Sequence, residues 1–195
     1  MKIAIYWWAF NPPTLWHLHV IEQIFKNSDI KKIIITPDWE RWDKNYNISN
    51  LHRGNLIDLF IDDLKNKWLN IELDKYFLNW ANKSNTTTYE VDKYFIKKIW
   101  TQPFHIFWTD IVEWISDWDW NPNMYIQKKL KKIFIPRKWY SFNNSELKNY
   151  ILIETNYLSD ISSTTARIRI KEWINLNQIL ERNILNYIHK NKLYT

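Results

Sequence analysis

The sequence has almost no glycine and no cysteine. Gly54 is the single glycine in 195 residues, whereas an average composition of about 7% would give roughly 14. Without cysteine, neither a disulfide framework nor a thiolate metal site can form. No apolar run approaches the roughly 18 residues of a membrane span, and no signal peptide precedes the first predicted strand. We therefore expect a cytoplasmic protein that does not bind membranes.

Tryptophan is unusually abundant: the sequence contains 14 tryptophans. Many stand where glycine is usual: Trp68 follows a predicted helix and precedes a strand, and Trp173 follows a helical run. Trp39 and Trp139 lie in turn contexts. Our hypothesis is that UGA codons meaning glycine in the source were translated as tryptophan. The alternative is that the tryptophans are genuine.

The first twenty residues carry the most specific pattern. Residues 2–6 predict a short buried strand, and residues 15–26 predict an amphipathic helix. Between them lies Asn-Pro-Pro-Thr at 11–14, and His17 follows in the first helical turn. The free N–H groups of a helix N-terminus point at one spot there and attract phosphate.

Strands and helices alternate along the remainder of the chain. This alternation predicts a Rossmann-like α/β fold, a doubly wound parallel sheet that binds ligands at the carboxyl ends of its strands. We expect residues 1–195 to form one domain, with a helical C-terminal portion from about residue 163. Ser49 and Thr87 are predicted to cap helices, and further strands are predicted at 32–36, 70–73, 104–107, 133–136 and 150–154.

A second chemical motif, ISSTTAR, spans Ile161 to Arg167. It opens a predicted helix. Hydroxyl groups and free backbone N–H groups at a helix start, with a guanidinium one turn further, form a phosphate cradle. Taken alone, the motif is more readily explained as a Ser/Thr-capped helix with a solvated arginine.

Together these motifs resemble the nucleotidyltransferase family. Its first signature is Gly-Gly-x-Phe-[Asp/Asn]-Pro followed by [His/Thr]-x-Gly-His, and ISSTTAR resembles its second, Ile-Ser-[Ser/Thr]-Thr-x-[Ile/Leu]-Arg. An indole at a signature glycine would fill the space that a nucleotide needs, so the loop as printed could not receive a triphosphate. Phe10, Asn11, Pro12, Thr14 and His17 match the first signature, and Trp7, Trp8 and Trp16 stand at its glycines.

Features in the middle of the chain resemble the nicotinate-nucleotide adenylyltransferases in particular. FWTD, ending at Asp110, resembles their Gly-[Ala/Thr]-Asp. Trp118 lies where these enzymes carry a tryptophan that stacks on the pyridine ring. NTTTYEV aligns Thr87 with the threonine of their nicotinate site, although Thr86 replaces the tyrosine of that segment.

The resemblance implies adenylyl transfer from ATP to nicotinate mononucleotide, which gives deamido-NAD and pyrophosphate. The attacking phosphate is already an anion, so catalysis would consist of positioning and charge stabilisation. Mg²⁺ would bind mainly through the ATP phosphates, without a metal site of the protein's own. His17 and Thr14 would act at the α-phosphate. ATP would contact Trp7, Trp8, Ala9, Phe10, Trp16, Asp110, Ser162, Ser163, Thr164 and Arg167, and the nucleotide substrate would contact Thr87, Trp118, Asp119, Lys44 and Arg137.

Several alternatives stay open from the sequence. Lys44 and Arg137 could equally be solvated surface charges, and the acceptor could be nicotinamide mononucleotide or another phosphate. If the tryptophans are genuine, a Trp-rich chain of net charge +6 could bind single-stranded nucleic acid by stacking and charge. The tryptophans fall at turns and motif glycines rather than along one face, so we do not expect nucleic acid as a partner. Homo-oligomer formation stays open.

Overall fold

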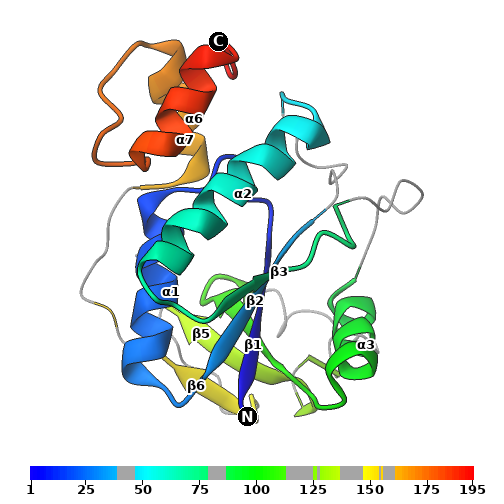
Figure 1. Cartoon of the computed structure of the whole chain (residues 1–195). Coiled ribbons are helices and arrows are strands. Elements are labelled where there is room, and N and C mark those ends of the chain that lie inside the picture. Colours follow the sequence, from blue (N-terminus) through cyan, green and yellow to red (C-terminus); the bar gives the residue numbers. More distant parts are fainter. Residues whose placement is uncertain are drawn as a thin grey trace.

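A six-stranded parallel sheet lies at the centre of the protein (Figure 1). The computed structural model describes residues 1–38, 47–78, 87–112, 125–126, 128–136, 147–153, 155 and 161–195. The strands are β1 (Ile3–Trp8), β2 (Lys32–Pro37), β3 (Ile71–Leu73), β4 (Phe104–Trp108), β5 (Lys131–Ile135) and β6 (Tyr150–Leu152).

The strand order is β3-β2-β1-β4-β5-β6. The chain runs outward from β1 to β3 and then returns to place β4 on the other side of β1. Ala4 of β1 lies opposite Phe104 of β4. In an open parallel sheet, the point where the strand order reverses leaves a crevice at the carboxyl ends of the two strands. Residues that follow β1 and β4 therefore border the same crevice.

Helices cover both faces of the sheet, which confirms the predicted doubly wound α/β fold. In Figure 1, α1 (Leu15–Asn27) and α2 (Asn50–Asn66) lie on one face and α3 (Thr88–Ile99) on the other. The predicted C-terminal helical portion is also present: α6 (Ser163–Lys171) and α7 (Arg182–Lys190) pack together beyond the carboxyl ends of the strands, where α7 meets α2.

The alternation of side chains along β1 explains the two apolar layers. Ala4 and Tyr6 pack into the core with α1 and α2, whereas Ile3 and Ile5 pack with Phe95 of α3. Successive residues of a strand point to opposite faces. A central parallel strand must therefore be apolar on both sides, as the sequence of β1 is.

The helix caps follow the sequence prediction. The Ser49 hydroxyl accepts a hydrogen bond from the His52 backbone N–H at 3.3 Å. Thr87 and Glu90 form a reciprocal capping box at the start of α3. Strand ends were predicted less well: β1 continues through Trp8, and β5 begins at Lys131 rather than at residue 133. The β6 strand ends at Leu152.

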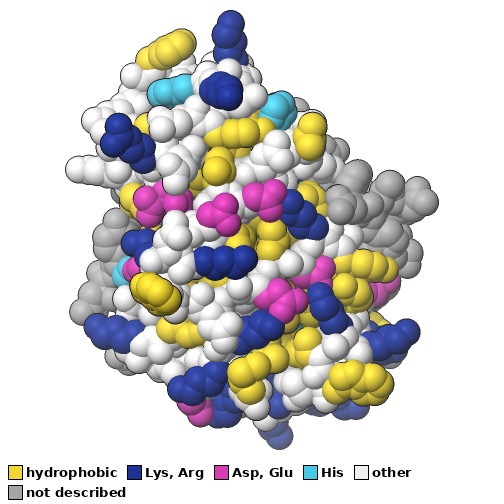
Figure 2. Space-filling view, viewed as in Figure 1, with side chains coloured by type: hydrophobic (Ala, Val, Ile, Leu, Met, Phe, Trp, Pro, Cys, Tyr) yellow, Lys and Arg dark blue, Asp and Glu magenta, His cyan; other side chains and the backbone are white. Residues whose placement is uncertain are grey.

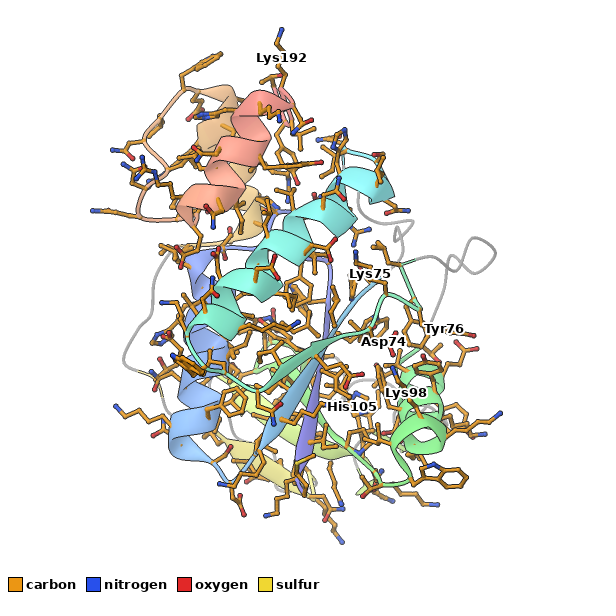
Figure 3. All side chains as sticks on the ribbon, viewed as in Figure 1. Asp74, Lys75, Tyr76, Lys98, His105 and Lys192 are labelled. Atoms are coloured by element: carbon orange, nitrogen blue, oxygen red, sulfur yellow. The ribbon has the colours of Figure 1, made fainter. Side chains whose placement is uncertain are left out.

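A buried carboxylate connects α3 to the sheet. Asp92 is fully buried, and its Oδ1 lies 2.8 Å from Nε2 of the buried His105 at the start of β4. The Tyr125 hydroxyl donates to the other oxygen of Asp92. His105 thus has a structural role, because it helps to hold α3 on the sheet. At the sheet edge, Asp74 accepts from both Tyr94 and Lys98 of α3, so α3 is held at two places (Figure 3).

Three tryptophans end helices in the left-handed conformation. The φ angles are 62° for Trp68, 56° for Trp100 and 56° for Trp173, and their exposed fractions are 95%, 90% and 86%. After α2, the N–H of Trp68 donates to Lys65 O and that of Leu69 to Leu64 O. This bonding pattern is the Schellman motif, in which glycine usually occupies the position of Trp68.

Glycine at positions 68, 100 and 173 is expected to stabilise the fold by roughly 1 kcal/mol per site, because only glycine adopts the left-handed region without steric cost. The exposed indoles pack against few other atoms, so their replacement removes little packing. Urea denaturation of the triple variant, monitored by far-UV circular dichroism, measures the change. Alanine at the same three positions is the control and should give little of this gain, since alanine keeps a Cβ atom. Equal stability of the two triple variants would contradict the explanation.

Candidate functional site

The two signature motifs meet in the structure, although they lie near opposite ends of the sequence. The Ser163 hydroxyl donates to Pro12 O at 2.8 Å. Nη1 of Arg167 donates to Asn11 O at 2.7 Å. The start of α6 is therefore docked on the loop that joins β1 to α1. This loop, residues 9–14, borders the crevice at the end of β1.

His17 is held in one tautomer by the loop. It is the third residue of α1, and its ring is buried between Tyr6 and Phe10. The backbone N–H of Thr14 donates to Nδ1 of His17 at 3.0 Å, and the Thr14 hydroxyl lies 2.8 Å from the same nitrogen. A nitrogen that accepts an N–H bond carries no proton, so the ring proton is on Nε2. His17 therefore presents an N–H donor at the helix N-terminus.

Burial lowers the pKa of His17 from 6.5 to about 3. The imidazole is consequently neutral at physiological pH and acts as a hydrogen-bond donor rather than as an acid. Because the folded-state pKa is below the unfolded one, the unfolded chain takes up the proton first on acidification. The stability that depends on neutral His17 is complete above pH 6.5 and is lost as the pH falls toward 3.

We expect the ring ¹⁵N signals of His17 to stay in the neutral Nε2–H pattern from pH 8 to pH 5, a range in which an ordinary histidine titrates. Burial is the cause that disfavours protonation of the ring and holds its pKa near 3. Long-range ¹H–¹⁵N spectra of the histidine-labelled protein measure this. Titration of the His17 signals within this range would disprove the assignment.

Indole rings fill the crevice between β1 and β4. Trp16 of α1 stacks on Trp108, the last residue of β4, with ring centroids 5.5 Å apart and planes at 17°. Trp8 meets Trp108 edge-on at 6.2 Å. Trp16 also stacks on His19. Indole rings from Trp8, Trp16 and Trp108 are therefore in contact beside the end of β4. That they exclude a nucleotide from the loop as printed stays a prediction.

Trp7 fits its position poorly. Its Nε1 atom is buried and has no hydrogen-bond partner among the described residues. The hydroxyl of Thr36, which pairs with Trp7 across β1 and β2, is in the same situation. A buried donor without a partner costs about 1–3 kcal/mol. The printed residue thus conflicts with the surroundings in which the fold places it.

The hydroxyl groups of the second motif make hydrogen bonds within the protein. The Ser162 hydroxyl accepts from the Thr165 N–H at 3.0 Å and caps α6. The Thr164 hydroxyl accepts from Nη2 of Arg167 at 3.1 Å. Ser163 and Arg167 bind the loop carbonyls. The structure brings all four residues to the start of α6, and their contact with phosphate stays a prediction.

The remaining predicted residues divide into two groups. Asp110 lies in the turn after β4, two residues beyond Trp108. Thr87 is the N-cap of α3, on the opposite sheet face from α1. Four predicted contacts lie outside the described residues, namely Lys44, Trp118, Asp119 and Arg137.

Arg53 is a site residue that the sequence analysis did not identify. It has no exposed surface. Nη2 of Arg53 donates to Ala9 O at 2.8 Å, to Asp38 O at 2.8 Å and to Asp38 Oδ1 at 3.0 Å. The guanidinium thus ties the start of the 9–14 loop to the end of β2. A signal was present, because Arg53 lies on the apolar stripe of α2 that Phe60 and Leu64 continue.

Neither a membrane helix nor an acidic metal cluster is found in the part of the chain that the structure describes. No described helix is long and apolar enough to cross a bilayer. No three His, Cys, Asp or Glu side chains in the described ranges gather as a group that could hold a metal ion. A divalent cation at this site would take its ligands chiefly from phosphate oxygens and water.

The strand order and the helix N-termini at the switch point define a nucleotide-binding α/β protein of the Rossmann type. The chain belongs to the cytidylyltransferase-like family, whose model matches residues 5–169.

Relatives of known description agree with this membership. The chain is 26% identical over 98% of its length to a protein of Acholeplasma laidlawii described as a probable nicotinate-nucleotide adenylyltransferase, of which the match covers 97%. Its fold is similar to that of Plasmodium falciparum nicotinic acid mononucleotide adenylyltransferase. The structure of that protein complexed with NaAD matches with a TM-score of 0.78 at 23% identity, over 100% of this chain and 98% of the other. The structure complexed with APC matches with a TM-score of 0.75 at 23% identity, over 99% and 96%.

Proposed function

We propose that this protein transfers the adenylyl group of ATP to nicotinate mononucleotide, with release of pyrophosphate and formation of deamido-NAD. The observation that carries the proposal is His17, a neutral Nε2–H donor at the N-terminus of α1. It lies beside the switch point of the sheet, on a loop to which α6 is docked. The relatives described as nicotinate-nucleotide adenylyltransferases support the choice of substrate.

The reaction needs few groups from the protein. A phosphate oxygen of nicotinate mononucleotide attacks the α-phosphorus of ATP, and the bond from that phosphorus to the bridging oxygen breaks in line. The N–H of His17 would donate to an α-phosphate oxygen as its negative charge grows, and Thr14 holds the imidazole for this purpose. Mg²⁺, bound through the ATP phosphates, would supply charge neutralisation. Ser162, Ser163, Thr164 and Arg167 would bind the β- and γ-phosphates at the start of α6.

The nucleotide substrate would lie across the sheet from α1. Thr87 at the N-cap of α3 is our candidate for the nicotinate side, together with Trp118 and Asp119, and Asp110 is our candidate for the adenosine ribose. Lys44 and Arg137 are candidates for the nucleotide phosphate. Choice of the acid over the amide would require N–H donors aimed at the carboxylate. An acceptor with an amide, nicotinamide mononucleotide, is the alternative within the same reaction.

We also propose that most tryptophans of the printed sequence stand for glycine. Three observations support this: the left-handed backbone at Trp68, Trp100 and Trp173, the two stacked indoles in the crevice, and the buried Nε1 of Trp7. The codons decide the matter. UGA at these positions, with glycine in peptides of the protein isolated from its source, is expected. UGG codons would exclude the proposal.

The test of function uses a synthetic gene with glycine at every tryptophan position except 118 and 120, which we call the glycine variant. We expect ATP-dependent pyrophosphate release with nicotinate mononucleotide and Mg²⁺, and much less with nicotinamide mononucleotide. The chain as printed is the matched control and should be inactive, because Trp16 and Trp108 fill the crevice. Release with the amide alone would change the substrate, and no release with either acceptor would refute adenylyl transfer to pyridine nucleotides.

One observation favours a second candidate function, the binding of single-stranded nucleic acid. Trp68, Trp100 and Trp173 are nearly fully exposed and could stack on bases. They end three different helices, however. Figure 2 shows basic side chains interspersed with acidic and apolar ones over the visible face rather than in a stripe. Binding of a labelled oligonucleotide by the printed chain, lost in the glycine variant, would support this function.

A further inference from the structure

We propose that Tyr194 is a positioning residue of the site: its hydroxyl fixes Asn11 and so holds the 9–14 loop in the geometry that His17 needs. This inference rests on the proposed function. The Tyr194 side chain is buried, and its hydroxyl donates to Oδ1 of Asn11 at 2.6 Å. Burial raises the pKa of Tyr194, so the phenol keeps its proton and remains a donor throughout the physiological range.

The loop receives a row of contacts from the C-terminal segment, residues 161–195. Tyr194 binds the Asn11 side chain, Arg167 binds the Asn11 carbonyl, and Ser163 binds the carbonyl of Pro12. The N–H of Leu15, the first residue of α1, donates to Ile179 O at 2.8 Å. These contacts bracket Thr14, which orients the imidazole. A shift of the loop would therefore move the Nε2–H donor.

Asn11 is the loop residue that receives contacts from both Tyr194 and Arg167. It is almost completely buried and follows Phe10, which has a φ of 47°. Loss of the Tyr194 hydroxyl would remove a donor to this buried side-chain oxygen, which costs free energy. The loop can relieve that cost by turning the Asn11 side chain outward, because Phe10 already has a strained backbone that would relax. Loss of the Tyr194 hydroxyl thus favours displacement of the loop.

Tyr194 itself is held in an unfavourable conformation. Its φ is 65°, in the left-handed region that side chains other than glycine and asparagine rarely adopt. Lys192, two residues earlier, has a φ of 50°, and Figure 3 shows its side chain at the outer end of α7, beyond α2. The chain therefore turns back sharply after α7, and this turn directs the Tyr194 ring inward to Asn11. Strain of this kind persists where surrounding contacts over-determine it.

The C-terminal segment is anchored to the protein independently of Tyr194. The Tyr187 hydroxyl of α7 accepts from Nδ2 of Asn55 at 2.7 Å and lies 2.9 Å from Nδ1 of His52. Ile184 and Ile188 are buried in the core. Removal of the Tyr194 hydroxyl should consequently loosen the loop while α7 stays on α2. Tyr187 offers the matched control, since its hydroxyl joins the same segment to α2 rather than to the loop.

The experiment compares Tyr194→Phe with Tyr187→Phe in the glycine variant. We expect Tyr194→Phe to lower kcat about tenfold with KM for both substrates within about twofold, because misplacement of a donor acts on the transition state. Tyr187→Phe should keep kcat within about twofold even if it lowers thermal stability as much. Equal kcat for the two variants would overturn the positioning role.

A second readout does not depend on activity. Amide hydrogen exchange followed by mass spectrometry is expected to speed up in a peptide covering residues 9–18 in Tyr194→Phe and to stay unchanged there in Tyr187→Phe. If the glycine variant has no activity, the proposed function fails, and this exchange measurement still decides whether Tyr194 holds the loop. Unchanged exchange at residues 9–18 in Tyr194→Phe would refute the inference.

Discussion

Replacement of His17 by alanine in the glycine variant is expected to lower kcat by about a hundredfold to a thousandfold, the range measured for loss of one preorganised donor to a transition-state oxyanion. KM for ATP should change little, because the donor is needed most when charge accumulates on the α-phosphate. Steady-state pyrophosphate release at saturating nicotinate mononucleotide measures both constants.

Thr14→Val is the matched control for His17→Ala. It removes the hydroxyl at 2.8 Å from Nδ1 but keeps the backbone N–H at 3.0 Å. The tautomer is then still fixed, so we expect a loss of only about tenfold. Because the pKa of His17 is about 3, His17 does not titrate near pH 6.5. We therefore expect the pH dependence of kcat around pH 6.5 to be the same in the glycine variant and in both substituted variants. A kcat in His17→Ala equal to that of the glycine variant would refute the role of His17.

Arg53→Met is expected to lower the free energy of unfolding by about 3–5 kcal/mol, as is usual when one partner of a buried ion pair is removed. The methionine fills the space of the arginine stem but removes the guanidinium that pairs with Asp38, whose side chain is 9% exposed. The Ala9 carbonyl also loses its donor. Urea denaturation, monitored by far-UV circular dichroism, gives the value.

Lys75→Met is the control for Arg53→Met. It breaks the ion pair of Lys75 with Asp58, which has a comparable distance of 2.7 Å. The side chains of this second pair are 33% and 48% exposed, and we therefore expect a loss of less than about 1 kcal/mol. If the two substitutions lowered the free energy of unfolding by similar amounts, the burial of Arg53 would not explain its contribution to stability.

The fold could be predicted because each element carries its own signal. The strands β1, β2 and β4 are short runs of apolar residues, the helices repeat apolar residues at helical spacing, and Ser49 and Thr87 mark two helix starts. These signals are local and need no knowledge of distant residues. The start of β5 was missed because Lys131 and Lys132 are charged. Lys132 is nevertheless buried, since its ammonium donates to the carbonyls of Ile126 and Leu130.

The site could be predicted only where a motif marked it. The glycine slots of the first signature indicated the crevice that Trp16 and Trp108 fill. The partners of Arg53 and Tyr194 could not be read from the sequence, because their contacts join residues that no local pattern connects. Asn11 accepts from a tyrosine 183 positions away. Such contacts depend on how the C-terminal segment packs on the completed sheet.

The sequence separation of these contacts has a kinetic consequence. Arg167 reaches Asn11 across 156 positions, and pairing of β1 with β4 closes a loop of about a hundred residues. Closing such long loops costs conformational entropy before the new contacts stabilise the chain, and this cost slows folding. During refolding of the glycine variant, the secondary structure of the helices should therefore recover well before ATP can bind. Nucleotide binding would then report the last stage of assembly, and partly folded chains would have no means of capturing the ligand that could stabilise them.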